Sequence, residues 1–373
     1  GIAVAVDAFT SIPFAYLRFR HRPMRFATLR LISIALNIGL NLWFILLCPW
    51  LVRQMPSLSW IYDLAYGIGY KFLANLISSG VVLLLMIPEL RGFRWRFNAS
   101  LWREMLRYSY PLLVLGIAGI MNQTIDKILY PSLAPDEATA MQELGIYGAN
   151  YKIAIVMVMF IQAFRFAYEP YIFARDKESG RSGTSAYSEA MKYFVIFALC
   201  IFLGVMFYID IIKYFISPKY FSGLKVVPVV MLGEFFFGVF FNLSVWYKLT
   251  DKTLWGMWFS LLGLAVTLAL NVLLVPRFGY MGCAWAAVVC YGVMMVTSYF
   301  IGQRRYPIKY HAGRLAVIFA FAMAVYGLSL LIETQVAWVN MLIRTPLLAV
   351  FVAVVMKMEH ISLRSLIPSR RHA

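Results

Sequence analysis

The sequence is a succession of long apolar runs, most of them close to 20 residues, separated by short polar connectors. A run of that length is what an α-helix needs to cross the hydrocarbon core of a bilayer. The runs lack a strict two-residue alternation, which favours helices over a transmembrane barrel. We therefore predict eleven spanning helices, at 1–17, 27–48, 64–87, 111–130, 147–173, 191–212, 224–248, 254–275, 282–301, 313–332 and 337–356.

The composition excludes a large soluble catalytic domain. Of the 373 residues, 62% are apolar and 14% are charged, whereas a soluble globule has about 25% charged residues. The histidines lie in basic connectors or the tail. The cysteines form no Cys-x-x-Cys pair, so we expect no disulfide framework, metal site or cofactor. The cysteines, all in apolar runs, are Cys48, Cys200, Cys283 and Cys290.

Positive charge alternates between connectors and so orients the helices. Most of the 34 lysines and arginines fall in every second connector, for example in 18–30, 91–107 and 248–252. By the positive-inside rule, these connectors are cytoplasmic. Because this placement accounts for the net charge of +17, we expect no nucleic-acid partner.

A weak internal repeat indicates two helical bundles. The second and eighth predicted spans share the tripeptide Ala-Leu-Asn, at 35–37 and 269–271. Each is preceded by a span with an acid near its middle, Asp7 and Glu234 respectively. The matching spans are six apart in the chain, as expected if the protein consists of two related six-helix bundles.

Two segments resemble a known family. Residues 143–152 read Glu-Leu-Gly-Ile-Tyr-Gly-Ala-Asn-Tyr-Lys, and together with 160–170 they resemble the eighth span of bacterial oligosaccharide flippases. These are the Wzx-like polysaccharide biosynthesis proteins of the MOP (MATE-like) superfamily, here with a Bacteroidetes character. Residues 276–286 resemble that superfamily's Pro-x-x-Gly-x-x-Gly-Ala-Ala-x-Ala turn, with Cys283 and Trp285 as departures.

The resemblance implies an all-α, two-lobed transmembrane bundle of six plus six plus two helices. The predicted spans would then be the fourth to the fourteenth, with about three N-terminal helices lacking. On this interpretation, 1–110 is the remainder of the N-terminal lobe with a cytoplasmic linker. A complete six-helix lobe follows at 111–301, and 302–373 holds two additional spans and a basic cytoplasmic tail. We expect this chain to need the upstream spans for activity.

Ionisable residues within the spans are the candidate site. Each costs about 2.5–3.5 kcal/mol at the bilayer centre, so it normally faces a bundle interior or a wet cavity. Gln162, Arg165 and Glu169 share one face of a predicted helix, and Arg165 and Glu169 can pair at i, i+4. Either this pair only fixes helix packing, or Arg165 forks onto two oxygens of a pyrophosphate.

Further candidates for the substrate cavity lie nearer the outer ends of their spans. Asn122 and Asp126 share one face, with Lys127 on the neighbouring stripe. Lys71 and Lys152 are the remaining candidates. For the charged members, an interfacial, solvated position reached by snorkelling is the alternative interpretation.

Asp7 and Glu234 are the candidates for coupling transport to H⁺ or Na⁺, because they lie at similar depth in equivalent spans. Asn242 shares the face of Glu234. The alternative is a packing role in which each acid is protonated or hydrogen-bonded. Rows of amides and hydroxyls at 33–41 and 267–271 more often hold helices together than bind a substrate.

The function favoured by these patterns is a flippase, not an enzyme. It would move an isoprenoid-pyrophosphate-linked oligosaccharide across the bacterial inner membrane by alternating access, in contact with the lipid bilayer and polysaccharide assembly proteins. The sequence has no Walker motif. Alternatives of the same fold are a MATE-type drug or cation antiporter and a peptidoglycan-precursor flippase. An integral-membrane polysaccharide polymerase is a further alternative, although the short outer connectors disfavour it.

Overall fold

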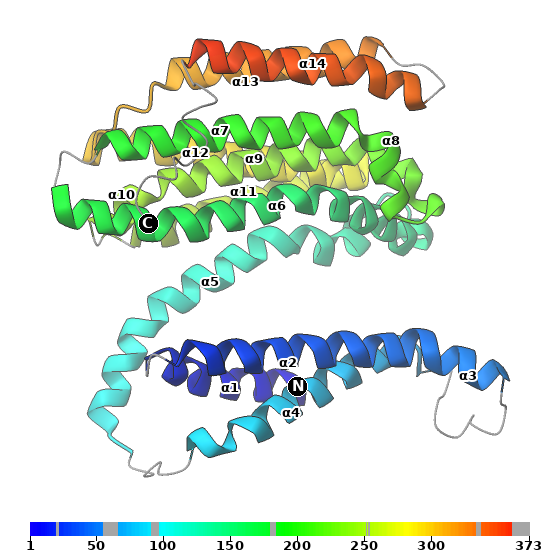
Figure 1. The fold of residues 1–373 in the computed structure, drawn as a ribbon, viewed down its shortest axis with the longest axis vertical. Coiled ribbons are helices and arrows are strands. Elements are labelled where there is room, and N and C mark those ends of the chain that lie inside the picture. The colour runs from blue at the N-terminus through cyan, green and yellow to red at the C-terminus, as the bar shows by residue number, and fades with distance from the viewer. Residues whose placement is uncertain are drawn as a thin grey trace, which may run out of the picture. The chain divides into compact units, whose positions relative to one another are not determined.

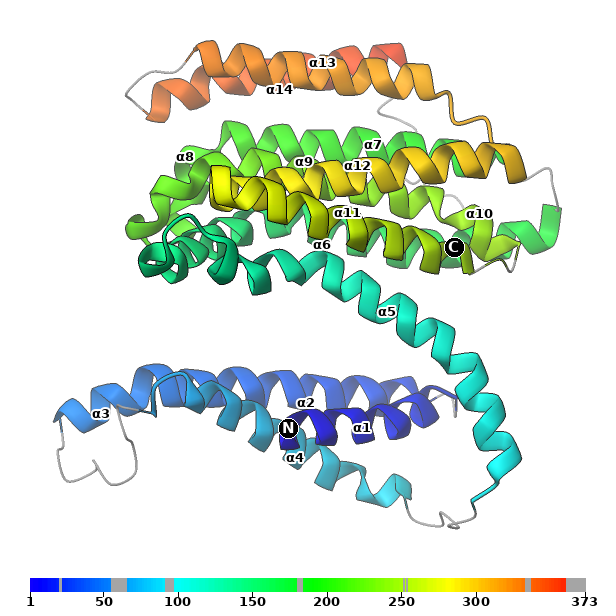
Figure 2. The same ribbon diagram turned by 180° about the vertical axis from the view of Figure 1, so that it is seen from behind.

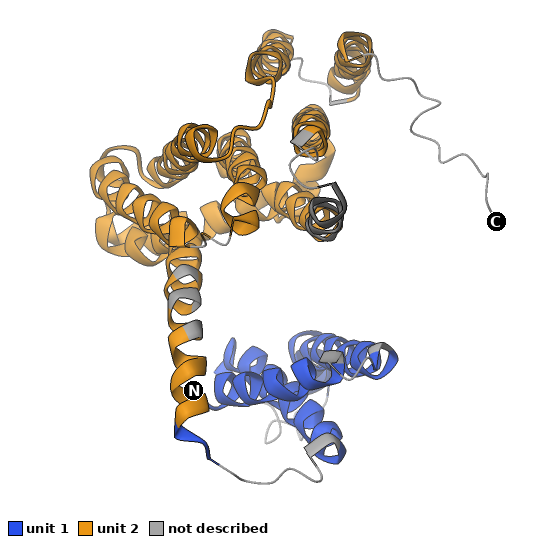
Figure 3. Ribbon diagram, turned by 90° about the vertical axis from the view of Figure 1, so that its left-hand side faces the viewer, with its two compact units in different colours: residues 1–99 blue, residues 100–373 orange. Residues whose placement is uncertain are grey.

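The computed structural model describes residues 1–19, 22–54, 66–90, 97–179, 184–250, 252, 254–332 and 337–359. Over these residues every regular element is a helix, which confirms the predicted all-α class. The chain divides into two compact units, residues 1–99 (unit 1) and 100–373 (unit 2), coloured separately in Figure 3.

In the described part of the chain, nine helices are long and apolar enough to cross a membrane. They coincide with nine of the eleven predicted spans, which confirms the multi-pass interpretation. The predicted span at 1–17 is a shorter apolar helix, Ile2–Leu17. The predicted span at 111–130 lies inside a longer helix that is not among the nine, Ala99–Leu133.

Unit 1 is built from helices that pack around α4. Its elements are α1 (Ile2–Phe19), α2 (Pro23–Leu42), a π-helical turn (Trp43–Leu47), α3 (Cys48–Gln54) and α4 (Gly69–Leu90). Pro23 opens α2 at a position where its missing N–H would have had no helical partner. α4 contacts both α1 and α2, and a small apolar cluster joins the three helices. Its members are Phe14, Leu17, Leu29, Val82 and Met86.

Polar side chains join the same helices of unit 1. The Ser78 hydroxyl of α4 donates to the backbone oxygen of Ser33 in α2 at 2.9 Å. Asn37 Nδ2 of α2 donates to Asn75 Oδ1 of α4 at 3.1 Å. These contacts agree with the interpretation of the 33–41 row as helix glue.

Unit 2 is a larger bundle with α9 at its centre (Figures 1 and 2). α9 contacts α6, α7 and α12, and α13 and α14 both pack on α7. The helices are α5 (Ala99–Leu133), α6 (Glu137–Ser179), α7 (Thr184–Phe207), α8 (Ile209–Ile212), α9 (Val227–Leu243), α10 (Val245–Leu249), α11 (Leu254–Phe278), α12 (Tyr280–Arg305), α13 (Ala312–Leu331) and α14 (Ala337–Met358). Two 3₁₀ segments, Lys213–Phe215 and Pro218–Val226, lead into α9.

The turn between α11 and α12 shows why the resembling motif has two glycines. Gly279 has a φ of 56°, in the left-handed region that side chains other than glycine rarely adopt. A Cβ on Gly282 would lie 2.6 Å from the backbone oxygen of Leu274. The turn therefore brings α12 into close contact with α11, which sets the position of the polar residues on both.

Candidate functional site

A cluster of polar side chains lies in the core of unit 2, within the spans. Five helices contribute to it, and its members surround a cavity of about 10 Å³. That volume is about what one water molecule requires. The polar cluster consists of Asn122, Gln123, Asp126 and Lys127 of α5, Tyr147 and Tyr151 of α6, Glu234 of α9, Thr267 and Asn271 of α11, and Cys283 and Tyr291 of α12.

Asp126 is buried and fully engaged by neighbours. The Tyr147 hydroxyl donates to its Oδ2 at 3.0 Å. The backbone N–H of Lys127 donates to its Oδ1 at 2.8 Å, and Lys127 Nζ lies 3.4 Å from the same oxygen. A buried carboxylate is costly unless it is paired and hydrogen-bonded, and these contacts supply both conditions.

Glu234 is the second buried acid of the cluster. The Tyr151 hydroxyl donates to its Oε1 at 2.6 Å. Lys127 Nζ lies 4.4 Å from the centroid of the Tyr151 ring, within cation–π range. A single lysine thus contacts Asp126 directly and the hydrogen-bond partner of Glu234, so a change of charge at either acid acts on shared neighbours.

Amides tie the cluster to α11. Asn122 Nδ2 donates to the backbone oxygen of Ser260 at 3.2 Å, and the Thr267 hydroxyl donates to Asn122 Oδ1 at 3.1 Å. Asn271 Oδ1 is buried and has no hydrogen-bond partner in the described part of the chain. A buried, unsatisfied carbonyl oxygen requires a donor, a water or a cation to complete it.

Arg165 lies away from this cluster. It is half-buried on α6, and its guanidinium carbon is 4.6 Å from the centroid of the Phe241 ring of α9. Lys248 of α10 approaches the same ring, with its Nζ 4.2 Å from the centroid. The fold therefore gathers two cations at Phe241, and we refer to these three residues as the cationic pair on Phe241.

The remaining candidates for the substrate cavity are dispersed. Gln162 and Lys152 are exposed on α6, and Lys71 is exposed on α4 of unit 1. Glu169 belongs to α6, but its side chain lies outside the described residues. Its pairing with Arg165 stays a prediction.

The coupling candidates occupy different surroundings. Asp7 is exposed on α1, where the Ser79 hydroxyl of α4 donates to its Oδ1 at 2.5 Å. Asn242 is buried on α9, and its Nδ2 donates to the backbone oxygen of Gly238 at 3.0 Å. The structure thus joins Glu234 to Asp126 and Lys127 and leaves Asn242 one turn or more away on its own helix.

Sequence reasoning missed several residues at these sites, among them Tyr147, Tyr151 and Lys248. Tyr147 and Tyr151 are four residues apart on α6, a spacing that places both hydroxyls on one face, and that spacing was the available signal. Lys248 was counted with a cytoplasmic connector, and nothing in the sequence links it to Arg165. Only the approach of both side chains to the Phe241 ring of α9 brings the two cations together.

These features define the class of the protein. It is a multi-pass helical bundle that keeps acids and cations inside its apolar layer, the arrangement found where ions or polar substrates cross a membrane. Residues 56–175 match the family model described as polysaccharide biosynthesis protein. A search among curated proteins returns no match.

The fold has a relative among solved structures. The chain matches "Lipid II flippase MurJ, inward closed conformation" with a TM-score of 0.59 and 16% sequence identity. The match covers 81% of this chain and 64% of the MurJ chain. This chain therefore spans less than two thirds of the length of MurJ. The family match supports the resemblance to polysaccharide biosynthesis proteins over residues 56–175, and the structural match shows a shared fold.

Proposed function

We propose that this protein is a flippase for an isoprenoid-pyrophosphate-linked oligosaccharide in the bacterial inner membrane. The observation that carries the proposal is the match of residues 56–175 to the polysaccharide biosynthesis family. That segment includes both Asp126 and Arg165, so the matched region contains part of the polar cluster and part of the cationic pair. The task needs no covalent chemistry, and the protein acts as a transporter with polysaccharide assembly proteins as partners.

The cationic pair on Phe241 receives the pyrophosphate. A planar guanidinium can fork onto two phosphate oxygens, and a nearby ammonium adds a second positive charge. The ring of Phe241 lies against both cations and limits their movement. Since Lys248 belongs to the cytoplasmic end of its span by the loop-charge rule, the pair is placed where a cytoplasmic substrate is loaded. Gln162, Glu169 and Lys152 of unit 2, and separately Lys71 of unit 1, are further candidates for contact with the substrate.

The polar cluster of unit 2 couples transport to H⁺ or Na⁺. Binding of a proton or cation at Asp126 or Glu234 competes with Lys127 and the two tyrosine hydroxyls that now hold these acids. The unsatisfied Asn271 Oδ1 is a further oxygen for the same ion. The ion thereby changes the packing of α5, α6 and α9 together, as rocking of one helical lobe against the other requires. Asp7 with Ser79 is the corresponding acid of unit 1.

Substitution of Arg165 in the full-length protein tests the proposal. Arg165→Ala should abolish surface polysaccharide in a flippase-deficient strain while the protein remains in the membrane. Arg165→Lys should restore it only in part, because a point charge lacks the bidentate fork. The matched control is Arg277→Ala, which removes an exposed arginine at the C-terminal end of α11. Normal polysaccharide with Arg165→Ala would refute the proposed role of Arg165.

A peptidoglycan-precursor flippase is the second candidate, and the shared fold with MurJ favours it. Both substrates present a pyrophosphate on an isoprenoid chain, so the cationic pair suits either. Complementation separates them. Rescue of a strain that lacks its lipid II flippase, without rescue of surface polysaccharide, would select the second candidate.

A further inference from the structure

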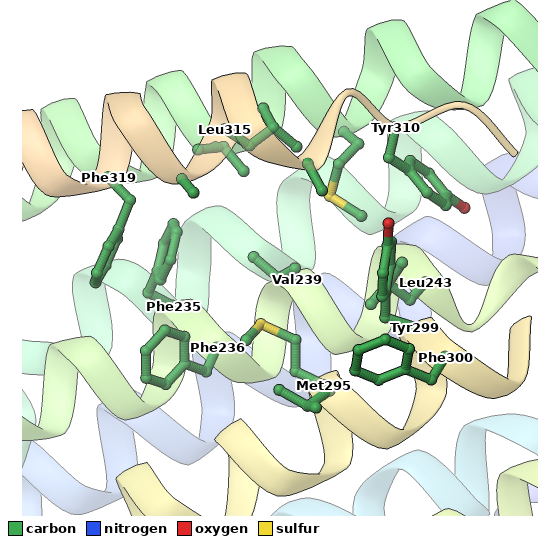
Figure 4. Close-up of a pocket in the computed structure, with 15 residues that line it drawn as sticks. Phe235, Phe236, Val239, Leu243, Met295, Tyr299, Phe300, Tyr310, Leu315 and Phe319 are labelled. Carbon is green, nitrogen blue, oxygen red and sulfur yellow. The ribbon is translucent and has the colours of Figure 1, made fainter. Parts of the chain in front are cut away.

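An apolar cavity of about 380 Å³ lies between α13 and the core helices of unit 2 (Figure 4). Side chains of α7, α9, α12 and α13 line it, among them Val239, Leu243, Met295 and Leu315. Phe235 and Phe236 of α9 meet Phe319 of α13 at one end, where the Phe235 and Phe319 rings stack with centroids 5.5 Å apart. Tyr299 and Tyr310 lie at the other end.

A second, polar cavity of about 630 Å³ continues from the tyrosine end. The two cavities share Tyr310 and Leu315. The polar cavity is formed where the first turns of α7 and α13, the connector before α13 and the end of α14 come together. Its charged or titratable lining residues are Glu189, Lys192, Lys309, His311, Arg314 and Glu359.

The polar cavity has an excess of positive charge. Lys192 is engaged by Glu359, with Nζ 3.5 Å from Oε2. Lys309 and Arg314 are exposed and form no ion pair within the described part of the chain, and Glu189 is an exposed acid on α7. Burial raises the pKa of Tyr310, so its hydroxyl keeps its proton and can donate. Two cations and a hydroxyl therefore mark the mouth of the apolar cavity.

The dimensions of the two cavities suit one acyl chain. From Ala312 to Phe319 the helix rises about 10 Å, which is less than the ~15 Å depth of one leaflet in a hydrocarbon core of about 30 Å. A long isoprenoid chain would exceed such a cavity, whereas part of an acyl chain of the same leaflet would fill it. The loop-charge rule places Lys309 and Arg314 on the cytoplasmic side, beside the phosphates of that leaflet.

We propose that the two cavities together form a binding site for an anionic glycerophospholipid of the cytoplasmic leaflet. Its phosphate lies between Lys309 and Arg314, and one acyl chain follows α13 past Val239 to the Phe235–Phe319 stack. Basic pockets between helices at the cytoplasmic surface bind such headgroups. The bound lipid braces α13 and α14 against the bundle, on which both helices pack chiefly through α7.

Native mass spectrometry of the delipidated full-length protein tests the site, with phosphatidylglycerol and phosphatidylcholine of identical acyl chains as probes. The unsubstituted protein should bind phosphatidylglycerol more tightly than phosphatidylcholine. Lys309→Gln/Arg314→Gln should weaken phosphatidylglycerol binding about thirty-fold, since each basic residue near an anionic lipid contributes about fivefold, and should leave phosphatidylcholine unchanged. Val239→Phe, which fills the apolar cavity, should weaken both lipids.

The control is Lys219→Gln/Arg277→Gln, which removes two exposed charges elsewhere in unit 2 and should preserve the preference. Equal binding of the two lipids by the unsubstituted protein would overturn the proposal. An equal loss of phosphatidylglycerol binding in the control would also overturn it, because net charge alone would then explain the preference. Displacement of phosphatidylglycerol by undecaprenyl pyrophosphate at equal concentration would also overturn it, because the occupant would then be the transport substrate. Gel filtration verifies that each variant is folded. Lipid binding is measured without transport, so failure of this proposal leaves the proposed transport function untouched.

Discussion

The two units contain equally apolar helices but bury them very differently. In the most apolar part of Met24–Val52, in unit 1, 6% of residues are buried inside the protein, whereas in Pro218–Leu249 of unit 2 the fraction is 72%. Hydropathy therefore predicts that a helix is surrounded by apolar material, but it does not distinguish lipid from protein. What differs is the number of neighbouring helices, and α9 has them on several sides.

The acids of the two units follow the same contrast. Asp7 is exposed and accepts a hydrogen bond from Ser79, whereas Glu234 is buried with Tyr151 and shares its surroundings with Asp126 and Lys127. An exposed acid can change partners with little loss of free energy. A buried acid that loses its partner destabilises the protein by several times more. The effects of substitution should therefore be larger in unit 2.

The largest expected difference is in transport. Glu234→Gln removes the charge from the polar cluster while keeping the size and one acceptor oxygen, and it should slow flipping by about 5- to 150-fold, the range of typical coupling free energies. Asp7→Asn should have a smaller effect because its site is open. Flipping of a lipid-linked oligosaccharide in proteoliposomes measures both. A larger effect of Asp7→Asn would reverse the comparison and place the coupling site in unit 1.

The second difference concerns glycines. Gly282→Ala would drive a Cβ against the backbone oxygen of Leu274, and overpacking of this kind costs about 1–3 kcal/mol. Gly80→Ala in α4 meets nothing within 4 Å and should be neutral or stabilising by up to about 1 kcal/mol, because alanine favours helix. Thermal unfolding in detergent compares the two. Equal tolerance would show that α11 and α12 are not closely packed.

A third, smaller difference is expected from hydroxyl removal. Tyr151→Phe leaves the buried Glu234 without its donor and should destabilise the protein by about 1.5 kcal/mol, near the upper end for side-chain bonds in membranes. Ser79→Ala removes the donor to the exposed Asp7 and should cost less, because Asp7 lacks the close packing that surrounds Glu234. Unfolding midpoints of the two variants in the same detergent measure this difference. Equal losses would indicate that Asp7 is also shielded.

The smallest effect should come from the amide pair of unit 1. A double-mutant cycle with Asn37→Leu and Asn75→Leu should show a coupling energy of about 0.6 kcal/mol, the average for such pairs in bilayers. The matched cycle in unit 2 uses Asn122→Leu and Thr267→Val, whose bond is buried, and should show a larger coupling. Zero coupling between Asn37 and Asn75 would contradict the helix-glue interpretation.

Much of the candidate site could be predicted because ionisable residues stand out in apolar runs. Asp126, Lys127 and Glu234 were all identifiable from a single sequence for this reason. The sequence placed Asp126 and Lys127 in the substrate cavity and Glu234 in ion coupling. It gave no sign that Lys127 contacts both Asp126 and the tyrosine that binds Glu234. Residues 126 and 234 are more than a hundred positions apart, and no local pattern reports such a distance. Tyr147 and Tyr151 are common apolar-layer residues whose hydroxyls acquire a role only through these partners.

The sequence by itself determined that the chain is helical and crosses a membrane many times, and its loop charges predict on which side the connectors lie. These properties follow from run length, periodicity and loop charge, each of which acts over about 20 residues or fewer. Only the tertiary structure decided which helices surround α9, which acids share Lys127, and that Arg165 and Lys248 meet at Phe241. Those contacts depend on side-chain shape and close approach of backbones, as at Gly282, and such packing is a property of several helices at once.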